Sequence, residues 1–386
     1  MTEINIKEAI PDKNSFFNVK RFKIGNLNQD FLIKTMDIPN TSKKLWQSNQ
    51  GMKENRLIFE KTKTIKSFED LKGLLNESND KKINNFFDKK TWLNHSFTLF
   101  HATLKFNPYN HVKKLSEIEG FWHYYYTFSK DALLIPNIVK DKTPYEEDKP
   151  QKKEEIVSFS EYMRFVDELY QLFQQMNNKP IFVPISLKFS ITEIKQLIEH
   201  YLSKEYFYYW IDFESRPADP SNSAIYAKIR QINILLRNSK QFDKCVMFVT
   251  NLRREIISNI KDENSPASDI LGTLCGANII GVNRDPAKYF PEMRDKPIKA
   301  IQHKARLFDP ESYYYKMLKN NNPNKAVNIT ENSTRVGNEF DKQKEAFLED
   351  LNIQTYLKKK EMINQYNNGK ILKSIQLKEE VNKKLF

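Results

Sequence analysis

The chain has 386 residues, enough for one large α/β domain with additions or for two ordinary domains. It carries 62 Lys and Arg against 49 Asp and Glu, and the resulting net charge of +13 suits a polyanionic partner such as RNA or DNA. A solvated, lysine-rich surface is the alternative explanation. The amino terminus has no apolar signal core and no apolar run is long enough to cross a bilayer, so we expect a soluble cytoplasmic protein without a membrane partner.

The chain has too few suitably spaced cysteines and histidines for the common disulfide and zinc-binding motifs. Cys245 and Cys275 lie in apolar segments, which predicts buried thiols in a reducing compartment. The sequence contains no CxxC motif, no Cys/His cluster and no H-E-x-x-H pair, which excludes a zinc site built from cysteines. We therefore expect no cofactor, with Mg²⁺ considered only for the nuclease alternative below.

The first 130 residues are expected to supply strands and the early units of the fold. FNVKRFKIGN (17–26), FLIKTMDI (31–38) and HSFTLFHATLKFNPY (95–109) have strand patterns, and SFEDLKGLLNES (67–78) has the pattern of a short helix. The aromatic segment EGFWHYYYTFS (119–129) is predicted to pack as a strand, with base stacking by its rings as the alternative.

From about residue 131 the sequence alternates between short apolar runs and helical patterns. This alternation indicates right-handed βαβ crossovers and a parallel sheet. No GxGxxG run and no P-loop is present in the sequence, so we predict a TIM-like (β/α) barrel in preference to a doubly wound sheet that binds a dinucleotide. Strands are expected at 131–138, 180–187, 206–213, 245–250 and 277–282, and helices at 159–176, 191–202 and 223–238.

Four segments summarise the predicted organisation. They are N-terminal strands with early barrel units (1–130), the main barrel (131–318), a linker (319–338) and a C-terminal helical extension (339–386). The linker is inferred from its Asn- and Pro-containing composition. Phe340, Phe347 and Leu351 share one face of the helix that follows, which predicts that this helix packs on the body of the protein.

Candidate functional residues follow the predicted strands. Asp212 and Glu214 come directly after the aromatic strand YFYYWIDF (206–213), and the carboxyl ends of parallel strands face the ligand site in barrels and open α/β sheets. Alternatively, Asp212 has a structural role only, either as the cap of the next helix or as the partner of an arginine. The candidate phosphate contacts are Arg216, Arg253, Arg254 and Arg284.

Two segments carry a resemblance to a known family. IVKDKTPY (138–145) is similar to a D-x-x-T-P loop, one residue shorter, and VMFV (246–249) followed by GANIIG (276–281) occupies the place of an apolar strand and a G-x-D-x-F-D strand. In this order the features resemble the tRNA-guanine transglycosylase superfamily, which includes enzymes that insert 7-deazaguanine bases into tRNA and relatives that act on DNA. The resemblance covers residues 131–285.

The resemblance implies a barrel that exchanges a base in tRNA or DNA, with a 7-deazaguanine as the incoming base. Asp141 is the one carboxylate that its local motif carries over as a catalytic candidate. Gly281 stands where the family has its nucleophilic aspartate, and no CxCxxC zinc module follows the barrel. The active centre is thus expected to be altered or lost.

Three functions stay open from the sequence. The first is base exchange on nucleic acid, with Asp212 and Glu214 nominated by position. The second is a non-enzymatic subunit that binds RNA or DNA, which the glycine at position 281 favours. The third is a metal-dependent nuclease, because carboxylates two residues apart on a strand point to the same side and can share divalent cations. A homo-oligomer or a larger complex is compatible with all three.

Overall fold

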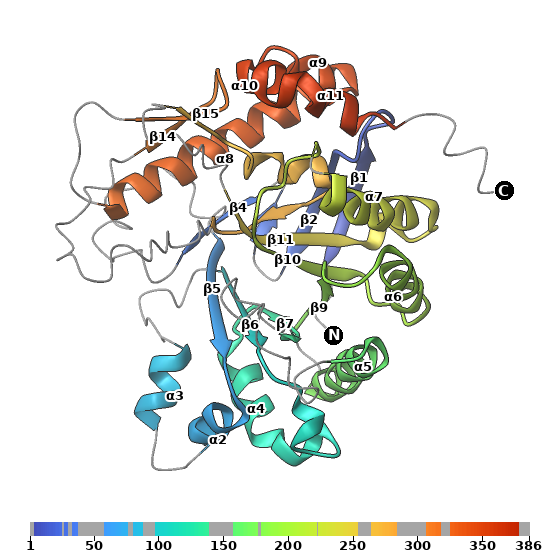
Figure 1. The fold of residues 1–386 in the computed structure, drawn as a ribbon, viewed down its shortest axis with the longest axis vertical. Helices are drawn as coiled ribbons and strands as arrows, with labels where there is room; N and C mark the ends of the chain where they lie inside the picture. The colour runs from blue at the N-terminus through green and yellow to red at the C-terminus, as the bar shows by residue number, and fades with distance from the viewer. Residues whose placement is uncertain are drawn as a thin grey trace, which may run out of the picture.

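A closed barrel of eight parallel strands forms the centre of the protein (Figure 1). Its strands in the computed structural model are β4 (Ile33–Asp37), β5 (Ile58–Ile65), β6 (Phe97–Leu104), β7 (Ala132–Leu134), β9 (Ile181–Ser186), β10 (Tyr208–Arg216), β11 (Val246–Leu252) and β13 (Ile279–Ile280). Each strand pairs in parallel with the next, and β13 pairs with β4 to close the ring. The predicted TIM-like barrel is confirmed.

The structure describes residues 4–24, 27–29, 33–37, 58–75, 80–87, 97–138, 157–176, 179–221, 223–253, 264–283, 306–317 and 325–377. Within these ranges, no helix combines the length and the apolar character that crossing a bilayer requires. The strand expected at 131–138 is divided into β7 and β8 (Asn137–Ile138), and both parts pair with β6.

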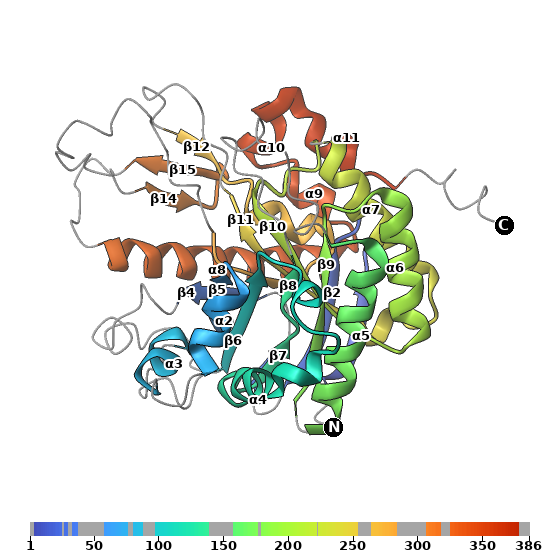
Figure 2. The same cartoon turned by 60° about the horizontal axis from the view of Figure 1, so that its bottom comes forward.

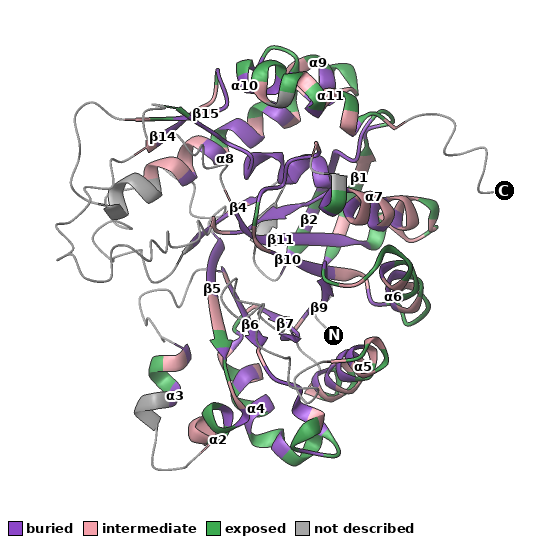
Figure 3. Cartoon of the chain, in the orientation of Figure 1, coloured by how far each residue is buried: buried purple, intermediate pink, exposed green. Residues whose placement is uncertain are grey.

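Helices surround the barrel on its outer side (Figure 2). They are α2 (Phe68–Leu75), α3 (Asp80–Phe87), α4 (Glu119–Phe128), α5 (Phe159–Met176), α6 (Ile191–Ser203) and α7 (Ser223–Asn238). The predicted ranges 159–176 and 223–238 coincide with α5 and α7. The start of α6 is fixed by a capping box, in which Ser190 and Glu193 each accept the backbone N–H of the other. Figure 3 shows barrel strands that are mostly buried and helices that expose their outer faces.

The aromatic segment 119–129 forms helix α4, so the predicted strand is wrong. Phe121, Trp122 and Tyr125 lie on its buried face, at the spacing of one helical turn. Trp122 Nε1 donates to the carbonyl of Leu115 at 3.0 Å, and the Tyr125 hydroxyl donates to Leu134 at 2.7 Å. Packing of these rings against the barrel outweighs the strand preference of aromatic residues, and it removes them from base stacking.

An antiparallel sheet of three strands closes the amino end of the barrel. Its strands are β1 (Asn5–Pro11), β2 (Asn18–Ile24) and β3 (Leu27–Gln29). Phe22 and Ile24 belong to the same buried cluster as Ile33, Ile58 and Val246, the first residues of three barrel strands. Because apolar side chains fill this end, polar side chains inside the barrel gather toward the carboxyl ends of the strands.

The C-terminal part consists of a small sheet and four helices. They are β12 (Asn264–Pro266), β14 (Arg306–Asp309), β15 (Tyr314–Met317), α8 (Lys325–Asp350), α9 (Ile353–Leu357), α10 (Glu361–Gln365) and α11 (Lys370–Ile375). Short 3₁₀ turns occur at Pro108–Asn110, Leu115–Ile118, Phe242–Lys244, Ile270–Cys275 and Tyr366–Gly369.

Helix α8 begins at Lys325, inside the segment expected to be a linker (319–338), so helix replaces linker over most of that range. As predicted, Phe340 and Phe347 are buried, and the Phe347 ring packs edge-on against Phe17 at 5.2 Å. Leu351 differs from the prediction because it is 52% exposed. The C-terminal helices therefore pack on the body of the protein.

Candidate active site at the carboxyl end of the barrel

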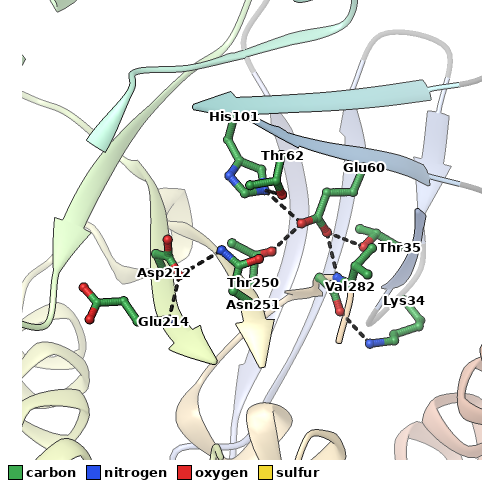
Figure 4. A network of polar contacts seen from close by, with 11 residues as sticks. Lys34, Thr35, Glu60, Thr62, His101, Asp212, Glu214, Thr250, Asn251 and Val282 are labelled. Atoms are coloured by element: carbon green, nitrogen blue, oxygen red, sulfur yellow. Dashed lines mark hydrogen bonds and ion pairs between the residues drawn. The ribbon is translucent and has the colours of Figure 1, made fainter. Parts of the chain in front are cut away.

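Asp212 lies inside the barrel near the carboxyl end of β10. Trp210 belongs to the interior cluster, and side chains alternate along a strand, so Asp212 faces inward as well. The carboxylate is buried, and its Oδ1 accepts hydrogen bonds from the backbone N–H of Glu214 at 2.7 Å and from Asn251 Nδ2 at 2.9 Å (Figure 4). Two donors from the ends of β10 and β11 thus fix its orientation.

The backbone around Asp212 is strained. Glu214 (φ 51°), Ser215 (φ 59°) and Asn251 (φ 54°) occupy the left-handed region, which costs non-glycine residues about 1–3 kcal/mol each. The pairing of β10 with β11 is irregular between Asp212 and Arg216. Strain of this kind persists where surrounding contacts enforce it, and it concentrates at functional sites. The ends of these two strands are therefore the strongest candidate site in the described part of the chain.

The Glu214 carboxylate lies beside two basic side chains. Its carboxylate lies 3.7 Å from Lys188 Nζ and 3.8 Å from an Arg216 guanidinium nitrogen, and Figure 4 shows it directed away from the Glu60 carboxylate. The expectation that Asp212 and Glu214 point to the same side fails because the left-handed Glu214 breaks the strand alternation. In the described ranges, no group of three or more His, Cys, Asp or Glu converges as metal ligands would.

A metal-dependent nuclease would need further acidic residues beside Asp212, and Asp243, Asp262 and Asp269 are the ones that the sequence offers. Asp243 lies in the 3₁₀ turn that precedes β11, at the opposite end of that strand from Asn251. Asp269 accepts from Tyr315 and Asn283 outside the barrel interior. Asp262 lies outside the described residues. The nuclease alternative therefore has no ligand set among the residues that the structure places.

The predicted phosphate contacts are placed only in part. Arg253 follows β11, and its backbone N–H donates to the carbonyl of Arg216, at the end of β10, at 3.1 Å. Arg216 is exposed, whereas Nε of Arg253 is buried and has no hydrogen-bond partner among the described residues. Asp141, Arg254 and Arg284 lie outside the described residues, so their predicted roles stay predictions.

A second carboxylate, Glu60, lies wholly buried in the barrel interior (Figure 4). One oxygen lies 2.9 Å from Nε2 of His101 and accepts from the Thr250 hydroxyl. The other accepts from the Thr35 hydroxyl at 2.6 Å and from the Val282 N–H at 2.8 Å. A single side chain of β5 thus contacts β4, β6, β11 and the segment after β13.

Burial alone would raise the pKa of Glu60. The hydrogen bond and charge of His101, together with the hydroxyls of Thr250 and Thr35, outweigh burial and hold the pKa at about 2. Glu60 is thus an anion at neutral pH. A carboxylate enclosed by these donors orders the strands around it, because removing a donor would leave a buried charge without its hydrogen bonds.

The sequence interpretation passed over Glu60 and His101. Glu60 lies in IFEKTKTI (58–65), where five consecutive polar residues suggest a solvent-exposed segment, and His101 has no partner nearby in the sequence. The Glu60 side chain points into the closed barrel instead. The available signal was a glutamate alternating with threonines in a strand of a predicted barrel, where both faces are buried.

Position 281 has no room for a side chain. A Cβ added to Gly281 would lie 2.6 Å from both Cβ and Oγ1 of Thr250, closer than real contacts allow. Thr250 occupies the space in question and donates to Glu60. With this backbone, the aspartate that the resembled family carries at this position does not fit.

Another polar cluster joins β4 and β13 to the small C-terminal sheet. Lys34 Nζ donates to the carbonyl of Gly281 at 2.5 Å and to Asn283 Oδ1 at 2.8 Å. Asp269 Oδ2 accepts from Asn283 and, at 2.8 Å, from the Tyr315 hydroxyl. Burial lowers the pKa of Lys34, although the charges of Asp269 and Glu60 oppose it. These contacts attach the sheet to the barrel wall.

No protein-family model matches the chain, and no curated protein matches it. The fold and site define the class by themselves: a TIM-like (β/α) barrel with an anchored aspartate where its β10 and β11 strands end. The resemblance to transglycosylases stays a prediction.

Proposed function

We propose that the protein acts on nucleic acid at the carboxyl end of its barrel, in a base-exchange reaction that uses the carboxylate of Asp212. The observation that carries the proposal is the anchoring of Asp212 by Asn251 and by the Glu214 N–H at a strained strand end. In (β/α) barrels, the active site lies at the carboxyl ends of the strands, and its catalytic residues come from those ends.

In such an exchange, the glycosidic bond between the sugar C1′ and the leaving base breaks, and a bond from C1′ to the incoming base forms. A carboxylate assists by adding to C1′ between the two steps or by moving the proton of a base nitrogen. The two hydrogen bonds to Oδ1 of Asp212 hold the group in one orientation for either role, which limits the entropy lost on reaching the transition state.

Basic side chains around Asp212 support a polyanionic substrate. Lys188 and Arg216 contact the Glu214 carboxylate, and Arg253 follows β11, where its backbone N–H donates to the carbonyl of Arg216. Together with the net charge of +13, these residues suit phosphate groups near the barrel mouth.

A binding protein without chemistry is the second candidate. The contact between Gly281 and Thr250 favours it, because the position that carries the nucleophile in the resembled family admits no side chain here. Under this alternative, Asp212 and its neighbours bind the nucleic acid without breaking a bond.

Two assays test the proposal. Fluorescence anisotropy with tRNA and with duplex DNA should show binding at low salt that weakens steeply as salt rises, because phosphate contacts release counterions. Incubation of each nucleic acid with a labelled 7-deazaguanine should then show incorporation. Binding without incorporation would select the second candidate, and absence of binding at low salt would refute both.

A further inference from the structure

A buried carboxylate connects the C-terminal helices to the β14–β15 hairpin. Glu339 of α8 is 1% exposed. Its Oε1 accepts from the hydroxyl of Tyr313, in the hairpin turn, at 2.6 Å and from that of Tyr356, in α9, at 2.7 Å. Gln343, one turn further along α8, donates from Nε2 to the same Tyr313 hydroxyl at 2.9 Å. Three elements thus meet at one acidic side chain.

The hydrogen bonds of this cluster are unevenly distributed. Every donor that reaches Glu339 contacts Oε1, whereas Oε2 is buried and has no partner among the described residues. Gln343 Oε1 is likewise buried and without a partner in the described ranges. Two acceptors without donors on one helix face are costly, since each unmet buried polar group costs about 1–3 kcal/mol.

We propose that Glu339 carries a proton on Oε2 in the folded protein and that this proton makes the docking of the C-terminal helices sensitive to pH. A neutral carboxyl group has one oxygen that only accepts and one that donates. The first matches Oε1, which receives both tyrosine hydroxyls. The second gives Oε2 a donor role toward Gln343 Oε1, the acceptor on the next turn of α8. This inference does not depend on the proposed function.

Lys360, at the start of α10, is the cation that favours the ionised form. Its Nζ lies 3.6 Å from Glu339 Oε1, but its hydrogen bond goes to the carbonyl of Pro310 at 2.8 Å. The ammonium also lies 4.4 Å from the centre of the Tyr356 ring and 5.0 Å from that of Tyr313, so it has other stabilising contacts. Lys360 therefore does not require a charged glutamate as its partner.

The electrostatic balance agrees with this geometry. Burial raises the pKa of Glu339 above its ordinary value, and it outweighs the opposing effects of Tyr313, Tyr356, Lys360 and Lys342. An acid whose pKa is higher in the folded state than in the unfolded state stabilises the folded protein when it is protonated. This contribution is complete below the pKa of the unfolded state, and it is lost as the pH rises through the pKa of the folded state. The C-terminal helices should be held most firmly at mildly acidic pH and loosen as pH increases.

Hydrogen exchange of the full-length protein tests the proposal. Peptides from 339–363 are followed from about pH 5 to about pH 9, after correction for the intrinsic pH dependence of exchange. In the wild type, the opening constant of this segment should rise with pH, about tenfold for each unit by which the folded pKa exceeds the unfolded one. In Glu339→Gln, whose amide reproduces the neutral acid, it should stay low and independent of pH.

Glu331→Gln is the matched control, because it removes a carboxylate from the same helix that pairs with Arg335 at the surface. Its exchange profile should follow that of the wild type. Infrared spectra should show the carbonyl stretch of a protonated carboxyl group in the wild type and lose it in Glu339→Gln. The proposal is overturned if that band is missing from the wild type, if the wild type shows no pH dependence, or if Glu339→Gln opens or unfolds at every pH.

Discussion

Thr250 and Asn251 are consecutive residues of β11 whose side chains bind two different buried carboxylates. The Thr250 hydroxyl donates to Glu60, and Asn251 Nδ2 donates to Asp212 at 2.9 Å. Asn251 adopts a left-handed conformation at this point, with φ 54°. The end of β11 therefore links the Glu60 carboxylate inside the barrel to the candidate active site.

Replacing Glu60 by Gln should lower stability at neutral pH. The folded pKa of about 2, against an ordinary value of 4.5, corresponds to about 3 kcal/mol of unfolding free energy. Because the folded pKa is depressed, this contribution is present above the unfolded pKa and is lost as pH falls from about 4.5 toward about 2. Urea unfolding across this range should give wild-type and variant curves that converge at low pH.

Glu8→Gln is the control for Glu60→Gln, since Glu8 forms an exposed ion pair with Arg21 at 3.8 Å. Its effect should be at most about 0.5 kcal/mol. A Glu60→Gln protein as stable as Glu8→Gln at neutral pH would show that the enclosed Glu60 carboxylate does not order the barrel.

Gly281→Ala should destabilise the protein. The new Cβ would meet Thr250 at 2.6 Å, and overpacking of a close contact costs about 1–3 kcal/mol. Gly337→Ala in helix α8 is the matched substitution, because no atom lies within 4 Å of its added Cβ. It should stabilise by about 0.5–1 kcal/mol. Equal denaturant midpoints for the two variants would mean that the backbone at Gly281 does not lie against Thr250.

Two substitutions of Asn251 separate the effect of its strained backbone from the effect of its side-chain hydrogen bond. Glycine adopts a positive φ without penalty, so Asn251→Gly should keep wild-type stability within about 1 kcal/mol. Asn251→Ala keeps the strain, loses the hydrogen bond to Asp212, and should be less stable than the glycine variant by about 1 kcal/mol. Both should lose base incorporation. Full incorporation by Asn251→Gly would show that Asn251 does not position Asp212.

Local patterns in the sequence predicted the strands and helices of the barrel. The polar contacts inside the barrel could not be predicted, because they join residues that are far apart in the sequence. Helices α5 and α7 match their predicted residues because apolar spacing and polar helix starts lie within each segment. The position of Asp212 at a strand end was predictable for the same reason. Glu60 was not, because its partners Thr35 and Thr250 come from distant strands that only the closed barrel brings together.

Two local interpretations failed for opposite reasons. The aromatic residues of α4 favour strand locally, but packing on the barrel places Phe121, Trp122 and Tyr125 on one helical face. Glu214 was expected to follow the alternation of β10, but its left-handed backbone turns the carboxylate toward Lys188 and Arg216. Neither the packing nor the strain is encoded in residue spacing alone.

Base exchange by wild type and Asp212→Asn is the measurement that tests the central claim most directly. The substitution keeps the shape of the side chain and removes its charge, and Asp167→Asn, which removes a carboxylate bound to His200 on the outer helices, is the control. Incorporation of labelled 7-deazaguanine into tRNA or DNA should fall by orders of magnitude in Asp212→Asn, with nucleic-acid affinity little changed, because the carboxylate acts mainly in the transition state. Undiminished incorporation in Asp212→Asn would contradict the assignment of Asp212 as the reacting carboxylate.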